Sequence, residues 1–186
     1  MTNRLIKIVA VKMFILCLTG CETTVEEKFA AAQKRLMPAA DDLTRAEPMG
    51  EVAGDPYIKG KIAVFNRAEI ATKQSGADGK AFFMTPLYFR ELEEIYAAEP
   101  NEVGTVAIVD CEKIEKGVYR SDDGREMPAE VEDCVLRLID RTENVTIFER
   151  KFEKDPSDER YAYGNSIVRQ SSEEDIVQYL KGLPRK

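Results

Sequence analysis

The sequence predicts an α+β domain, with an antiparallel or mixed sheet of about five strands and two helices packed on it, preceded by a flexible tether. Two observations carry this prediction. Strand-like segments follow one another between residues 103 and 152, and helix-like segments stand on either side of them, near residues 85–100 and 171–182. Strands grouped in succession, rather than alternating with helices, are typical of a sheet with helices on one face.

The first strand is expected at residues 58–65, where apolar and basic side chains alternate as they do on a half-buried strand. A helix is expected to start at Thr85 and Pro86, because a capping hydroxyl followed by proline at the first helical position is a common start. Apolar residues then recur with roughly helical spacing, and Pro100 marks the end of this segment.

Residues 103–109 are apolar on both faces, which predicts a central strand covered on both sides. A separate short strand is expected at 116–120, followed by a turn at 121–124, since Asp-Gly tolerates the positive φ of a tight hairpin. The clearest pair of strands is 131–140 and 144–152, joined by a short hairpin loop.

The chain is expected to end in an amphipathic helix. Ser171 and Glu174 have the spacing of a capping box. Ile176, Val177 and Leu180 supply an apolar stripe on one side of this helix. With this helix, the globular domain is expected to comprise residues 57–186.

The tether is expected at residues 21–56. Residues 25–36 are rich in Ala, Glu, Lys and Gln, which are good helix formers. The stretch after them is polar and carries prolines and glycines, a composition typical of a flexible linker. We therefore expect a helix and a flexible linker ahead of the globular domain.

Composition excludes several classes of function. The 186 residues include 34 acidic and 27 basic side chains, and such a surface is a poor partner for nucleic acid. The chain has no histidine, which excludes Ser-His and Cys-His nucleophile systems and histidine-containing zinc sites. Asp122, Asp123 and Glu126 do not have the spacing of an EF-hand loop. We predict no catalytic residue, no metal site and no cofactor.

The first twenty residues have the pattern of an export signal. Arg4, Lys7 and Lys12 supply positive charge before any acid, and residues 13–18 form an apolar core. The alternative is an uncleaved N-terminal membrane anchor. A spanning helix needs about 20 apolar residues, however, and Lys12 interrupts this segment.

Leu18, Thr19, Gly20 and Cys21 resemble the lipobox of bacterial lipoproteins. The resemblance implies that residues 1–20 are a signal peptide and that Cys21 becomes the first residue of the mature chain. It also implies that the Cys21 thiol carries diacylglycerol, with palmitate-type acyl chains. Two or three such chains anchor a protein stably to a membrane. Because an Asp after the cysteine favours the inner membrane in enteric bacteria, Glu22 weakly favours the outer membrane, facing the periplasm.

Two of the four cysteines are then left for the mature domain. Cys17 would leave with the signal peptide and Cys21 would be lipidated. Cys111 and Cys134 both fall at or near predicted strands, and in an oxidising compartment we expect a disulfide between them. The alternative is a pair of buried free thiols.

The function expected from these features is that of an envelope lipoprotein whose globular domain binds an envelope protein partner, without catalysis. The chief alternative is a carboxylate-dependent envelope hydrolase. A deep pocket with two converging acids of perturbed pKa would favour the hydrolase. An open sheet edge or an exposed apolar patch would favour the interaction module, and Tyr161 and Tyr163 are candidates for its contact surface.

Overall fold

The computed structural model describes residues 23–47, 55–69, 80–120, 124, 126–156, 162–163, 166–167 and 170–186. Its helices are α2 (Val25–Leu36), α3 (Ala40–Leu43), α4 (Pro86–Glu91) and α5 (Glu173–Gly182), with short 3₁₀ turns at Met37–Ala39, Glu93–Ile95 and Pro100–Glu102. Its strands are β1 (Lys61–Glu69), β2 (Lys80–Phe83), β3 (Val103–Arg120), β4 (Glu126–Asp140), β5 (Val145–Phe152), β6 (Ala162–Tyr163), β7 (Ser166–Ile167) and β8 (Gln170–Ser171).

The main sheet is mixed, and its strand order is β2-β1-β3-β4-β5, with β8 pairing β4. Strand β1 runs parallel to β3, whereas β2, β4 and β5 each pair antiparallel with their neighbours in this order. Strands β6 and β7 form a separate two-stranded pair. The α+β fold class that the sequence predicts is therefore confirmed.

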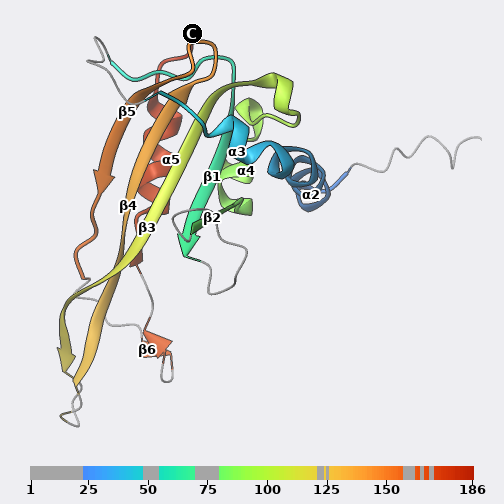
Figure 1. Ribbon diagram of the computed structural model, residues 1–186. Helices are drawn as coiled ribbons and strands as arrows, with labels where there is room; N and C mark the ends of the chain where they lie inside the picture. Colours follow the sequence, from blue (N-terminus) through green and yellow to red (C-terminus); the bar gives the residue numbers. More distant parts are fainter. Residues whose placement is uncertain are drawn as a thin grey trace, which may run out of the picture.

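Helix α5 covers one face of the sheet, which we call the back face. Phe148 and Phe152 of β5 lie opposite Leu138 and Cys134 of β4. The same two rings contact Tyr179 of α5 at centroid distances of 5.3 and 5.5 Å. Figure 1 shows α5 behind β3, β4 and β5. Side chains alternate between faces along a strand, so the intervening residues of β4 point to the opposite, front face.

Helices α2 and α3 are part of the globular core, which differs from the predicted tether. Their buried side chains belong to the same apolar cluster as the sheet: Ala32, Leu36, Ala40 and Leu43. The Phe29 ring meets the Phe89 ring of α4 edge-on at 5.7 Å. The globular body therefore includes residues 25–43 as well as those after residue 57. The physical reason is an apolar stripe along α2 at helical spacing, which needs a surface to cover it.

The edge of β1 that faces away from β3 pairs with β2 only from Asn66 onward, and the segment after α4 covers the part before it. The Tyr96 hydroxyl donates to the backbone oxygen of Val64 and accepts from its backbone nitrogen, both at 3.1 Å. The backbone nitrogen of Ala97 donates to Ile62 at 2.8 Å. Helix α4 begins at Pro86 as predicted but ends at Glu91, and Thr85 makes no capping hydrogen bond with its side chain. The chain leaves the helix early because it has to follow this strand edge.

Strand β3 is longer than predicted, because the segments expected as separate strands at 103–109 and 116–120 form one strand of 18 residues. The pairing with β4 shifts register between Glu115 and Val118, and Gly117 there has a φ of 142°. One extra residue of β3 is accommodated there as a bulge, and the pairing resumes at Val118. Figure 1 shows the β3–β4 ribbon extending beyond the other strands of the sheet.

Helix α5 begins one residue later than predicted, with Ser172 rather than Ser171 at the N-cap, and the expected Ser171–Glu174 capping box does not form. Ser172 occupies the N-cap position without a side-chain capping bond. Its hydroxyl instead lies 3.0 Å and 3.1 Å from the carbonyl oxygens of Glu132 and Phe152, which fastens the helix start to β4 and β5. The predicted stripe of Ile176, Val177 and Leu180 is buried, as expected.

Candidate functional site

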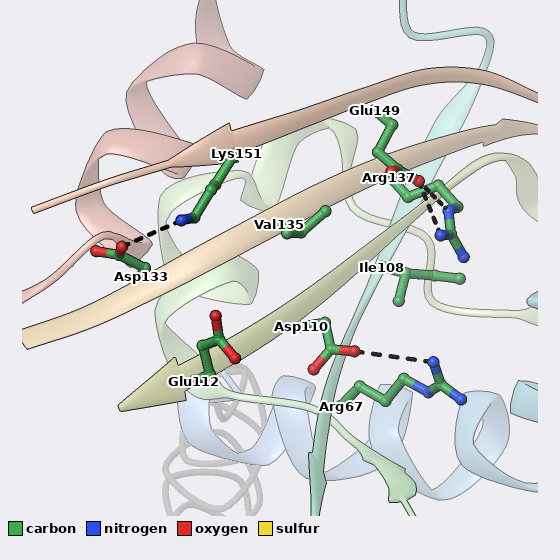
Figure 2. Close-up of a pocket in the computed structure, with 9 residues that line it drawn as sticks. All are labelled: Arg67, Ile108, Asp110, Glu112, Asp133, Val135, Arg137, Glu149 and Lys151. Carbon is green, nitrogen blue, oxygen red and sulfur yellow. Dashed lines mark hydrogen bonds and ion pairs between the residues drawn. The ribbon is translucent and has the colours of Figure 1, made fainter. Parts of the chain in front are cut away.

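The front face of the sheet carries an open groove with a cavity volume of about 280 Å³. We call it the front-face groove. Among the described residues only strands line it, and Figure 2 shows its side chains: Arg67 of β1, Ile108, Asp110 and Glu112 of β3, Asp133, Val135 and Arg137 of β4, and Glu149 and Lys151 of β5. Seven of these nine side chains are charged.

Strand alternation and register build the groove. Asp110 lies opposite Val135 and Glu112 lies opposite Asp133, so their side chains share the front face. The residue between Asp110 and Glu112 is Cys111, and its partner is Cys134. These cysteines point to the opposite, back face, as period-two geometry requires. A single register therefore sets both the charged groove and the disulfide behind it.

Most charges in the groove are paired with each other, as the dashed lines in Figure 2 show. The Nε and Nη2 atoms of Arg137 both lie 2.8 Å from Glu149 Oε2. Arg67 Nη1 lies 3.8 Å from Asp110 Oδ2. The exposed pair of Arg137 with Glu149 contributes only about 0.2–1 kcal/mol to stability. The larger effect of the paired charges is a fixed pattern of charge that can discriminate between partners.

Asp133 is the most buried charged residue of the groove, with 1% of its surface exposed. Its Oδ1 atom accepts from the backbone nitrogen of Lys154 at 3.0 Å and from Lys116 Nζ at 3.1 Å, and Lys151 Nζ lies 3.5 Å from Oδ2. Burial by itself would raise the pKa of Asp133. These hydrogen bonds and positive charges outweigh burial and hold the pKa below its ordinary value. Asp133 is therefore a carboxylate that orients its neighbours, and it is poorly suited to donate a proton.

Glu112 differs from the other acids of the groove. It is exposed, and within the described part of the chain its side chain has neither a hydrogen bond nor an ion pair. It lies directly across from Asp133, and like charges at opposing strand positions destabilise a sheet. Glu112 is thus available to a cationic group from outside the molecule.

A second polar cluster lies elsewhere, where α5, β1 and α4 meet. Asn66 Nδ2 donates to Glu173 Oε1 at 2.7 Å, and the buried Tyr88 lies close to both. Burial raises the pKa of Glu173 and the negative charge of Glu132 adds to this, while the hydrogen bond from Asn66 opposes it. No local pattern in the sequence marked this cluster, since its members come from separate elements.

The structure places the predicted site residues as follows. The disulfide between Cys111 and Cys134 is confirmed, with their Cα atoms 4.0 Å apart. The predicted lipobox, Leu18 to Cys21, lies outside the described residues, as do Asp122, Asp123 and Tyr161.

The described residues contain neither a metal-binding cluster nor a membrane-spanning helix. In that part of the chain no group of three or more Cys, Asp or Glu side chains is placed to hold a metal ion. No helix there is both long and apolar enough to cross a bilayer.

Comparison of the whole chain with protein-family models, with curated proteins and with solved structures finds no match.

Proposed function

We propose that this protein is a bacterial envelope lipoprotein, anchored by acyl chains on Cys21, whose α+β body binds a protein partner through the front-face groove. The anchor is supported by the lipobox pattern that ends at Cys21, and by the disulfide that suits an oxidising compartment. The acyl chains insert into an envelope membrane, for which Glu22 weakly favours the outer membrane, and the α+β body faces the periplasm.

One observation carries the binding role. Among the described residues, the Glu112 carboxylate has no partner, and it lies on a face that is otherwise lined by paired charges and two apolar side chains, Ile108 and Val135. Apolar side chains with fixed charges around them are characteristic of specific contact surfaces. The expected partner is a protein segment that offers a Lys or Arg side chain to Glu112.

The groove favours binding over hydrolysis. Carboxylate-dependent hydrolases need one acid whose pKa is raised, so that it is protonated near neutral pH and can act as a general acid. The pKa of Asp133 moves in the opposite direction. The pKa of Glu173 is raised, but Glu173 lies outside the groove, where it accepts a hydrogen bond from Asn66.

Site-specific photo-crosslinking in intact cells tests the binding role. A photoreactive amino acid at Glu112 is compared with the same group at Gln178, which is exposed on α5 on the back of the sheet. We expect a discrete crosslinked product from position 112 and none of that mass from position 178. No product from 112, or the same products from both positions, would reject the groove as the binding site.

The anchor is tested by metabolic labelling with a palmitate analogue. The wild-type chain should be labelled, and the Cys21→Ser variant should accumulate as an unlabelled precursor. Label retained by the variant would exclude lipidation at Cys21.

A further inference from the structure

We infer that the body of this protein is held directly against the bilayer surface, with the start of α2 towards the lipid, and does not stand off on a long tether. The inference rests on the proposed lipidation of Cys21. It follows from the docking of α2 onto the body.

Apolar contacts along its whole length hold α2 to the body. Val25 and Phe29 are half-buried against the core, and Ala32 and Leu36 are fully buried in it. Burying a large apolar side chain contributes about 1.5–3 kcal/mol, so this stripe is enough to keep the helix in place.

Polar contacts fix the position of α2 more closely. Lys28 Nζ lies 2.8 Å from Glu93 Oε1, and Arg35 Nη1 lies 2.7 Å from Glu99 Oε1. Both acids follow α4, in the segment that covers the edge of β1. The helix is thus fastened near each of its ends to the same part of the body.

The start of α2 is well defined, so it supplies no slack. The Thr24 side chain accepts from the backbone nitrogen of Glu27 at 3.2 Å, and the Glu27 side chain accepts from the backbone nitrogen of Thr24 at 3.0 Å. This reciprocal capping box fixes the start of the helix at Val25.

Chain length then limits the distance from the membrane. Four residue steps separate Cys21 from Val25. Because each step spans at most about 3.6 Å, the lipidated residue lies within about 14 Å of the docked helix. A flexible tether across residues 21–56 would have allowed a typical separation of about 30 Å or more.

Attraction to charged lipid is not what brings this end to the membrane. Glu26 and Glu27 are exposed in the first turn of α2, and acidic side chains are repelled by anionic headgroups. The covalent lipid anchor on Cys21 is what holds the start of α2 close to the bilayer surface. The β3–β4 ribbon, in contrast, lies on the other side of the molecule from α2 in Figure 1, so its exposed Val118 is expected far from the lipid.

Energy transfer to labelled lipid tests this arrangement. The full-length lipidated protein is reconstituted into phosphatidylcholine vesicles that contain an acceptor-labelled lipid. A donor is attached at Glu94→Cys, an exposed position next to the α2 contact, or at Val118→Cys on the ribbon. Cys111 and Cys134 do not react with the label, because they are joined in a disulfide.

We expect at least about a two-fold higher transfer efficiency from position 94 than from position 118, because the paired ribbon adds tens of ångströms. Inserting about twelve Gly and Ser residues after Glu22 should lower the transfer from position 94, since a flexible linker of that length frees the body. Equal transfer from both positions, or no effect of the insertion, would overturn the inference. Failure of the wild-type protein to float with the vesicles would instead reject the proposed lipid anchor.

Discussion

Cys111 and Cys134 occupy directly opposing positions on β3 and β4, where a disulfide joins them with their Cα atoms 4.0 Å apart. The bond lies on the back of the two strands that also carry the front-face groove. Beyond it, β3 continues to Arg120 as one arm of the projecting ribbon. The disulfide therefore fixes the register of both the groove and the base of the ribbon.

Removing this disulfide should destabilise the protein. For a sequence separation of 23 residues, the loop-entropy relation gives a loss of about 3 kcal/mol in the free energy of unfolding for the Cys111→Ala, Cys134→Ala double variant. Urea unfolding of both proteins, with and without reductant, measures this loss. Reductant should shift the wild-type midpoint and leave the double variant unchanged. A wild-type midpoint that does not respond to reductant would contradict the prediction.

Asp133→Asn should weaken the fold at neutral pH. Lys116 and the backbone nitrogen of Lys154 would lose a charged acceptor at a buried position, a change that costs roughly 1–3 kcal/mol. Glu149→Gln is the control, because it removes only an exposed pair with Arg137 and should cost less than about 1 kcal/mol. Chemical denaturation compares the two variants. An equal effect of both would show that the burial of Asp133 has no energetic consequence.

Asp133 should also make the stability of the fold depend on pH in the acid range. Because its folded-state pKa is lowered, its contribution is present above the unfolded pKa of about 3.9 and is lost as pH falls through the folded value. The wild-type protein should therefore lose more stability between neutral pH and acid than Asp133→Asn does. Melting temperatures measured down to low pH would show parallel curves if this carboxylate were not responsible.

Glu173 should produce the opposite pH dependence. Its folded-state pKa is raised, so its contribution is present below the unfolded pKa and is lost as pH rises through the folded value. Glu173→Gln keeps an acceptor for Asn66 and removes the charge, so its melting temperature should fall less than that of the wild type as pH rises from acid to neutral. Glu174→Gln, at an exposed position of the same helix, is the control and should follow the wild type. Identical curves for all three proteins would contradict the prediction.

Gly104 should tolerate no side chain. A Cβ atom there would lie 2.9 Å from the carbonyl carbon of Lys59 and would collide with its oxygen, and both neighbours are backbone. We expect Gly104→Ala to cost about 1–3 kcal/mol, as overpacking does. In contrast, Gly182→Ala meets no atom within 4 Å at the end of α5 and should be neutral or stabilising by up to about 1 kcal/mol. Thermal unfolding of the two variants separates these outcomes, and a destabilised Gly182→Ala with a normal Gly104→Ala would refute the argument.

The sequence by itself determined the features that depend on neighbouring residues. The alternation along residues 131–140 and 144–152 identified the β4–β5 hairpin, and the stripe that ends at Leu180 identified the buried side of α5. Cysteine content and strand positions pointed to the disulfide. Helix α2 was also located correctly, at Val25–Leu36, from its helix-forming residues.

Only the tertiary structure decided what these elements pack against. Val25, Phe29, Ala32 and Leu36 already had the spacing of a buried stripe, but no local pattern says which surface covers them. The parallel pairing of β1 with β3, and the meeting of Asn66 with Glu173, likewise join parts of the chain that are far apart in sequence. Local periodicity shows which side of a helix or strand is apolar. Which surface covers that side depends on how the whole chain buries its apolar area. As a result, α2 packs on the core instead of forming part of a tether, and side chains from four strands line the groove.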